Sequence, residues 1–386
     1  MVVIKKVGSK SILDSRKERT IFVSIDTNVG RFSASAPTGK STGKHESPVY
    51  RKSLEQDIET LNKFSDYFSE ENIDNFSDLR RVEDTVDRHI GANSLFALES
   101  AILKALANEQ KKEIWELINP RAKKFPRLVG NAIGGGKHSQ EKKKPDFQEF
   151  LLIPDEKSVK GSQEKNKDAK KELSRLLKKK DEKFSDKKSD EDAWETSLND
   201  KEIFKVLRET GIPLGTDVAA SGFFKRRKYH YENPMFKRTE EEQIVYISNL
   251  IRNFNLFYVE DPFDENDFDG FAKLLKKFPK TLIVGDDLIV TNYKRLGKAI
   301  KEKSVNAIII KPNQTGSLME VQRVCELAKK NGIKLVFSHR SGETEESILA
   351  DLAFGFSADF LKCGITGKER EAKIKRLIEI EKGFGR

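Results

Sequence analysis

Charged side chains end a series of short apolar segments in the second half of the chain. These segments end, in order, at Asp217, Glu260, Asp286, Lys311, His339 and Lys362. Three carboxylates without a cysteine or histidine cluster beside them are hard oxygen ligands, which suit Mg²⁺ better than structural zinc. A lysine next to such a cation can act as a base or hold an anion. The series therefore predicts metal-assisted chemistry on an anionic substrate.

The spacing of these segments predicts the elements that carry them. From Glu260 to Lys362 the charged ends follow one another at intervals of 23–28 residues, which is the length of one strand and one helix. A doubly wound sheet and a (β/α) barrel would both produce this rhythm. In a barrel, catalytic groups stand at the carboxyl ends of the strands, which is where we expect these side chains.

The first third of the chain has a different pattern. Residues 1–30 are typical of two strands, and residues 31–47 are expected to form a loop rich in Gly, Ser and Thr. Residues 53–120 are helical in pattern, most clearly over 92–107, where apolar residues recur at helical spacing. Strands followed by helices are typical of an α+β domain.

Length and composition limit the class of protein. The 386 residues suggest two domains, and 37% hydrophobic residues are enough to build a core. We expect no membrane span, because no apolar run is long enough, and no signal peptide. Two cysteines without CxxC spacing, Cys325 and Cys363, predict a reducing compartment, the cytoplasm.

The net charge of +10 raises the question of a nucleic-acid partner. Half of this excess lies in residues 156–190, which we expect to be a Lys-rich, solvated excursion with one amphipathic helix. Mixed Lys and Glu runs without interleaved aromatic residues are typical of a solvated face, so we do not expect nucleic acid to bind. A protein that binds RNA through this segment is the alternative from a different class.

Two further segments carry groups that suit a phosphorylated ligand. Arg340 and Ser341 follow a strand and combine a guanidinium with a turn, which suits a phosphate. His138 follows a run of glycines, and the Glu149 carboxylate stands shortly after it. The glycines would allow close backbone approach to a ligand.

A nucleotide-binding loop is a competing interpretation of Gly39-Lys-Ser41. This segment follows an apolar strand and fits a relaxed P-loop pattern, but Ala34 replaces the first glycine. Gly43 and Pro48 make a poor start for the helix that a P-loop needs beneath its phosphates. We therefore do not expect an ATPase.

Several strings along the chain occur in the order and near the spacing of known motifs. They are Leu13-Asp-Ser-Arg16, Pro37-Thr-Gly-Lys-Ser-Thr-Gly43 with His45-Glu46, Gly91-Ala-Asn93, Asn131 to His138, Val259-Glu-Asp-Pro-Phe263, Val284-Gly-Asp-Asp-Leu288, Val290-Thr-Asn292, Lys311-x-Asn313-Gln314-x-Gly316 and Ser338-His-Arg-Ser-Gly-Glu-Thr344. Through these strings the chain resembles the enolase (phosphopyruvate hydratase) family along nearly its whole length.

The resemblance implies an α/β fold: a smaller α+β domain over 1–124, with a mobile loop over 36–47, and a modified (β/α)₈ TIM barrel over 125–386. It also implies an enzyme, a lyase of glycolysis and gluconeogenesis. The implied reaction is the Mg²⁺-dependent, reversible dehydration of 2-phosphoglycerate to phosphoenolpyruvate.

The resemblance also implies roles for single residues. Two Mg²⁺ ions are expected, the first on Asp217, Glu260 and Asp286 and the second, which arrives with substrate, on Ser41. The other expected roles are Lys311 as the base that takes the C2 proton, Glu191 as the general acid supported by Glu149, Lys362 for the substrate carboxylate, Arg340 and Ser341 for the phosphate, and His138 and His339 in the closed site. Glu149, Glu260 and His138 are expected to contact the substrate as well.

Several positions depart from the family's pattern. Lys17-Glu-Arg19 stands where the family has Gly-Asn-Pro, Asp192-Ala193 stands where it has two glycines, and the C-terminal tail is missing. The resemblance implies a homodimer, although several departures fall where the family makes subunit contacts. The alternative prediction is an enolase-like paralogue with weak, altered or lost activity that binds a phosphorylated carboxylic acid.

Overall fold

The N-terminal part of the chain is an antiparallel sheet covered by helices. A computed structural model describes residues 1–40, 43–63 and 72–385. The sheet has the order β3-β2-β1-β4, and its strands are β1 (Val2–Leu13), β2 (Arg19–Thr27), β3 (Gly30–Ser35) and β4 (Asn72–Ile73). The two strands expected before residue 30 are confirmed. The loop expected over 31–47 is wrong for residues 31–35, because β3 pairs with β2 there.

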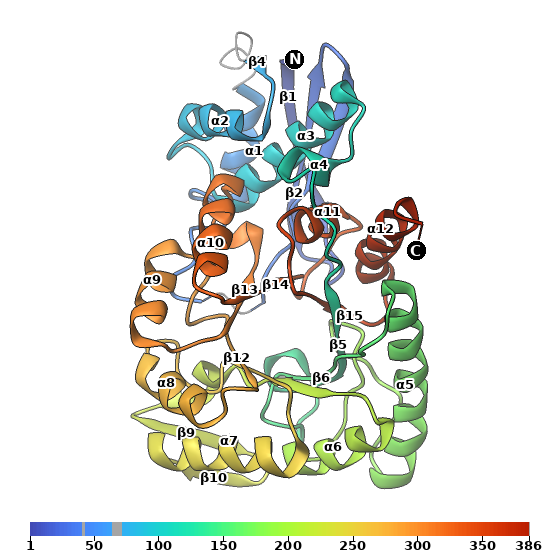
Figure 1. The fold of residues 1–386 in the computed structure, drawn as a ribbon, viewed down its shortest axis with the longest axis vertical. Helices are drawn as coiled ribbons and strands as arrows, with labels where there is room; N and C mark the ends of the chain where they lie inside the picture. Colours follow the sequence, from blue (N-terminus) through green and yellow to red (C-terminus); the bar gives the residue numbers. More distant parts are fainter. Residues whose placement is uncertain (41–42, 64–71, 386) are drawn as a thin grey trace.

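The helices of this part pack on the sheet or on one another, and the first and third of them contact its strands. They are α1 (Leu54–Lys63), α2 (Leu79–Val86), α3 (Ala92–Gln110) and α4 (Ile114–Ile118). Alternate residues of β2, such as Ile21 and Val23, are fully buried, as a strand with one covered face requires. Helix α3 contacts β2, β3 and the 3₁₀ turn Pro312–Gln314, so it joins the sheet to the second part of the chain (Figure 1).

The second part is a closed barrel in the order β5-β6-β7-β11-β12-β13-β14-β15. Strand β6 runs antiparallel to both neighbours and the other pairs are parallel, which confirms the expected modified (β/α)₈ barrel. The strands are β5 (Arg127–Gly134), β6 (Glu149–Leu152), β7 (Leu214–Asp217), β11 (Tyr258–Glu260), β12 (Leu282–Gly285), β13 (Ala307–Ile310), β14 (Lys334–Ser338) and β15 (Phe360–Gly364).

Helices surround the barrel (Figure 1). They are α5 (Val159–Lys180), α6 (Asp200–Leu207), α7 (Glu240–Phe254), α8 (Phe268–Lys277), α9 (Tyr293–Glu302), α10 (Leu318–Lys330), α11 (Ile348–Gly355) and α12 (Lys368–Gly383). Along the chain, β7 and α7 are separated by a small sheet of β8 (Phe224–Lys225), β9 (Lys228–Glu232) and β10 (Met235–Arg238).

The Lys-rich segment is not an excursion over residues 159–180. These residues form α5, which buries Leu173 and Leu177 and contacts β5, α6 and α12. Its lysines point mostly outward; the Lys171 side chain is 76% exposed. A surface helix needs only one apolar stripe, so its polar face dominates the composition. The amphipathic helix expected within the segment is confirmed, and it spans Val159–Lys180.

The inside of the barrel is filled with apolar side chains below the carboxyl ends of the strands. They come from alternate strand positions and include Val129, Leu151, Tyr258, Val284, Ile309, Val336 and Phe360. A packed interior leaves the rim as the place for chemistry. None of the described helices is both long enough and apolar enough to cross a membrane.

Candidate active site

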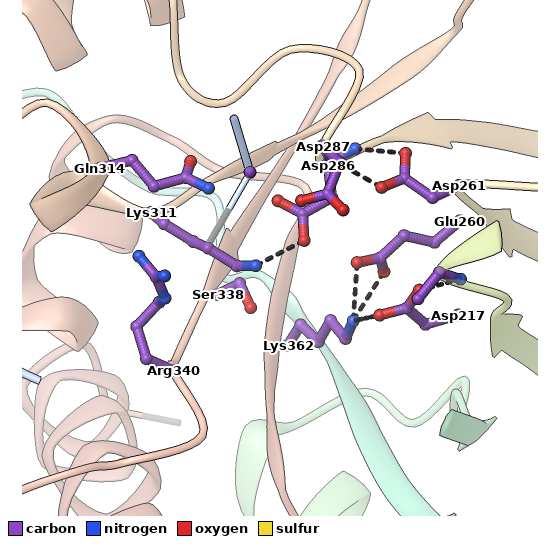
Figure 2. Close-up of polar contacts among 12 residues, drawn as sticks. Asp217, Glu260, Asp261, Asp286, Asp287, Lys311, Gln314, Ser338, Arg340 and Lys362 are labelled. Carbon is purple, nitrogen blue, oxygen red and sulfur yellow. Dashed lines mark hydrogen bonds and ion pairs between the residues drawn. The ribbon is translucent and has the colours of Figure 1, made fainter. Parts of the chain in front are cut away.

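Three buried carboxylates meet at the carboxyl ends of neighbouring barrel strands. Asp217 is the last residue of β7, Glu260 is the last residue of β11, and Asp286 follows β12. Asp217 and Glu260 stand opposite each other in the strand register. One oxygen from each of the three carboxylates lies within 4.8 Å of the others. The sequence-predicted carboxylate cluster is therefore assembled as expected (Figure 2).

Lys362, in β15, directs its ammonium into this cluster. Nζ donates to Asp217 Oδ2 at 3.0 Å and to the two Glu260 oxygens at 2.7 and 2.8 Å, and it lies 3.3 Å from Glu149 Oε2. Burial opposes the charge, but the carboxylates outweigh it and hold the pKa of Lys362 well above its usual value. The ammonium thus neutralises part of a dense negative charge.

Lys311 pairs with the third carboxylate. Its Nζ donates to Asp286 Oδ2 at 2.5 Å, and Figure 2 shows the two side chains directed toward each other. Burial disfavours both charges, but the attraction prevails: the pKa of Lys311 is raised and the pKa of Asp286 is lowered. Asp286 Oδ1 is buried and accepts no hydrogen bond from the described residues. A buried, unpartnered carboxylate oxygen beside two others suits a hard cation.

Glu191 lies between the two predicted histidines. His138 Nδ1 is 3.5 Å from Glu191 Oε1 and His339 Nε2 is 3.5 Å from Glu191 Oε2, while Asn131 Nδ2 donates to Glu191 Oε2 at 3.0 Å. Burial opposes the carboxylate charge, but the histidines hold the pKa of Glu191 well below its usual value. Against the same effect of burial, Glu191 raises the pKa of His339 to about 10. Glu191 is therefore ionised at neutral pH.

Glu149 has the opposite protonation. Burial and the neighbouring Glu191 charge raise the pKa of Glu149 to about 8. At pH 7 the proton of this carboxyl pair therefore resides on Glu149, while the charge resides on Glu191. Pairs of carboxyls whose pKa values are pushed apart in this way are typical of sites that transfer protons.

Arg340 and Ser341 lie beside the N-terminal part of the chain. Arg340 is 4% exposed, and its guanidinium donates to the Glu46 carboxylate and to Asn313. Ser341 Oγ accepts hydrogen bonds from the Lys40 backbone N–H at 2.8 Å and from Arg16 at 3.1 Å. The predicted phosphate-binding residues are thus in contact with the 36–47 segment. Ser41, the predicted ligand of a second ion, lies outside the described residues.

One hollow connects most of the predicted residues. Its volume is about 20 Å³, and its lining includes His138, Glu149, Glu191, Asp217, Lys311, His339, Arg340, Ser341 and Lys362. A larger cavity of about 370 Å³ also reaches Asp217 and extends past Asp286 to the Lys142–Lys144 segment. The site therefore consists of a small hollow lined by charged side chains and a larger neighbouring cavity, both of which reach Asp217.

Asp261 is a residue of the site that the sequence reasoning missed. Its carboxylate accepts the backbone N–H of Asp286 at 2.9 Å and that of Asp287 at 2.7 Å, as Figure 2 shows. These bonds fix the turn that aims Asp286 at the cluster. The available signal was its place beside Glu260 in the Val259-Glu-Asp-Pro-Phe263 string.

Comparisons with known proteins agree with this site. Residues 122–386 match the family model "Enolase, C-terminal TIM barrel domain". The chain is 37% identical over 404 residues to the enolase of Natronomonas pharaonis, covering 99% of each chain. It is 37% identical over 403 residues to that of Methanocorpusculum labreanum, covering 100% of each, and 34% identical over 397 residues to that of Archaeoglobus fulgidus, covering 98% and 97%. With one family matched across the barrel and along the whole chain, this protein belongs to the enolase family.

Proposed function

We propose that this protein catalyses the Mg²⁺-dependent, reversible dehydration of 2-phosphoglycerate to phosphoenolpyruvate. The observation that carries the proposal is the placement of Lys311 and Lys362 against three buried carboxylates at one end of the barrel. A C–H group next to a carboxylate is a very weak acid, because removal of its proton places a second negative charge on that carboxylate. Positive charge concentrated in a buried site stabilises this second negative charge as it develops.

The donor set supports a resident divalent cation. Asp217, Glu260 and Asp286 would hold Mg²⁺, since all three are buried oxygen donors and one Asp286 oxygen lacks a partner among the described residues. When bound, the ion supplies charge stabilisation to the substrate carboxylate. The second ion on Ser41 rests on the family's motif and stays part of the proposal.

The remaining roles follow from position. Lys311, which follows β13, would take the C2 proton as the neutral amine, so it must first release the proton that Asp286 stabilises. Lys362 would stay charged to offset the substrate carboxylate. Glu149 and Glu191 together hold one proton, which would leave with the C3 hydroxyl as water. Arg340 and Ser341 would bind the phosphate. His138 and His339 would stabilise the Glu191 charge.

The direct test follows phosphoenolpyruvate formation from 2-phosphoglycerate in excess Mg²⁺. We expect turnover in the unchanged chain, and its loss in Lys311→Ala, because the base is removed. Lys298→Ala, on the outer face of α9 with its side chain 54% exposed, is the matched control and should retain full activity. Substrate binding without turnover in the unchanged chain would overturn the proposal and favour the inactive paralogue instead.

Further expectations about the substrate class, the oligomeric state, the compartment and the domain boundary accompany this proposal. The substrate class is a phosphorylated carboxylic acid, and we propose a homodimer in the cytoplasm. A reducing compartment is consistent with Cys325 and Cys363, which are both free and buried. We propose the boundary between the two domains at residues 124 and 125, shortly before β5 begins at Arg127.

A further inference from the structure

The guanidinium of Arg340 is held by a carboxylate from the other part of the chain. Arg340 NH1 donates to Glu46 Oε2 at 3.1 Å, and NH2 donates to the same carboxylate at 3.1 and 3.3 Å. The two side chains are 4% and 5% exposed. Planar, two-point contacts of this kind fix both the position and the tilt of a guanidinium.

Counting the N–H donors of Arg340 shows which edge of its guanidinium has no acceptor among the described residues. A guanidinium has five N–H groups. The NH1 hydrogens are taken by Glu46 and by Asn313 Oδ1 at 3.3 Å, and one NH2 hydrogen is taken by Glu46. Among residues 1–40, 43–63 and 72–385, no acceptor is found for the Nε hydrogen or the second NH2 hydrogen, and Arg340 lines the hollow shared with Lys311 and Ser341. Gly39 lies against this edge, where a Cβ would be 1.9 Å from NH2 and 3.0 Å from Nε. Those two hydrogens form the edge that a phosphate can grip at two points.

Glu46 is itself held in place. Its Oε1 accepts the Gly43 backbone N–H at 2.9 Å and Gln314 Nε2 at 3.3 Å. Gln314 accepts from the Thr291 hydroxyl at 2.7 Å, and Thr291 accepts the backbone N–H of Lys311 at 3.0 Å. The carboxylate therefore belongs to a network that runs from Arg340 to the backbone of Lys311.

We infer that Glu46 is a positioning residue that orients Arg340 so that its Nε–NH2 edge faces the substrate phosphate. The inference rests on the proposed function and deepens it. A guanidinium without this anchor would rotate about its long side chain and would lose order that two-point binding needs. The opposing model is that Glu46 competes with the phosphate for Arg340, in which case its removal would strengthen phosphate binding.

The test measures binding of inorganic phosphate by calorimetry, together with steady-state kinetics on 2-phosphoglycerate. For Glu46→Gln we expect the phosphate Kd and the substrate KM to rise by about tenfold to a hundredfold, with a much smaller change in kcat. Glu46→Asp retains the charge and should recover part of the affinity. Glu265→Gln is the matched control, because Glu265 contacts Lys44 of the same segment at 3.2 Å without touching Arg340, and its phosphate Kd should not change.

A double-mutant cycle separates orientation from a general structural effect. Lysine in place of Arg340 has no planar edge to orient, so Glu46→Gln should weaken phosphate binding far less in an Arg340→Lys background than alone. Equal effects in both backgrounds, or tighter phosphate binding in Glu46→Gln, would overturn the inference. Absence of turnover in the unchanged chain would overturn the proposed function instead. The phosphate Kd values of the variants would still measure the coupling between Glu46 and Arg340 in that case.

Discussion

Lys362 acts as an internal cation among carboxylates, and replacing it with methionine tests that role. Methionine keeps a similar length and apolar stem but removes the ammonium from Asp217 and Glu260, whose oxygens lie 2.7–3.0 Å from Nζ. The cluster would then carry uncompensated buried charge. We expect Lys362→Met to lose stability without metal and to bind Mg²⁺ more tightly than the unchanged chain.

The geometry sets the expected size of both effects. Breaking a buried charge pair by removing one partner costs about 3–5 kcal/mol. A ligand at 100 times its Kd stabilises the native state by about 2.7 kcal/mol. If the lost ammonium raises the Mg²⁺ affinity tenfold, the same concentration adds about 1.4 kcal/mol more in the variant. Mg²⁺ should therefore reduce the stability difference between the variant and the unchanged chain by about 1.4 kcal/mol, roughly a third of the loss.

Urea unfolding with and without Mg²⁺ measures these terms, and Mg²⁺ titration of the folded protein gives the affinity. The matched control is Lys373→Met in α12. Lys373 is also 2% exposed and pairs with a carboxylate, Glu343, at 2.8 Å, but it does not contact the three-carboxylate cluster. This control should lose a comparable amount of stability and gain from Mg²⁺ only the roughly 2.7 kcal/mol that the unchanged chain gains.

Two results would refute this reasoning. The first is a Lys362→Met protein as stable as the unchanged chain without metal, which would mean that the carboxylates take up protons at no cost. The second is an equal gain in stability from Mg²⁺ in Lys362→Met and Lys373→Met, which would mean that the Lys362 ammonium does not compete with the ion. Tighter Mg²⁺ binding confined to Lys362→Met would support the competition between ammonium and cation.

Other predictions concern the scaffold. Burial and a neighbouring aspartate raise the pKa of Asp200 to about 8, so the stability that its neutral form provides is lost as pH rises from about 4 to 8; Asp200→Asn, which does not ionise, should gain on the unchanged chain across that window in urea unfolding at pH 5 and pH 8. Gly316→Ala should lower the unfolding midpoint, because φ is +78° and the new Cβ would lie 2.6 Å from Ala92 Cα. In α5, Leu177→Ala should cost about 2–5 kcal/mol by urea unfolding, whereas Lys171→Gln should change it little; equal values would contradict the packing of this helix.

The barrel and most of its site could be predicted because their signals are local. Strands β11 to β14 each end at or just before Glu260, Asp286, Lys311 or His339, and Lys362 lies two residues before the end of β15. Parallel strands bring their carboxyl ends to one rim. Asp217, Glu260 and Asp286 were therefore predicted together from spacing and residue type. Their meeting within 4.8 Å adds the distance that spacing alone does not determine.

The rest depends on contacts between residues far apart in the chain. The antiparallel direction of β6 appears only in its pairing with β5 and β7, and no pattern within Glu149–Leu152 specifies it. The Glu46–Arg340 pair joins residues 294 positions apart, and both residues read simply as charged members of separate strings. An amphipathic helix was predicted in the Lys-rich segment from its apolar stripe, but composition could not show that α5 spans Val159–Lys180 and packs against β5, α6 and α12.

The distribution of cations explains why net charge says little about the reaction. Among the described residues, the buried lysines and arginines are Lys170, Lys362, Lys373, Arg340 and Arg370, out of 72 in the chain. An exposed lysine gains little from a neighbouring carboxylate, whereas a buried one remains charged only where carboxylates compensate its desolvation. Lys362 and Arg340 meet this condition through Asp217, Glu260 and Glu46. The electrostatics of the site therefore depend on these few compensated charges. Substitutions of exposed residues could change the net charge of +10 without affecting these buried groups.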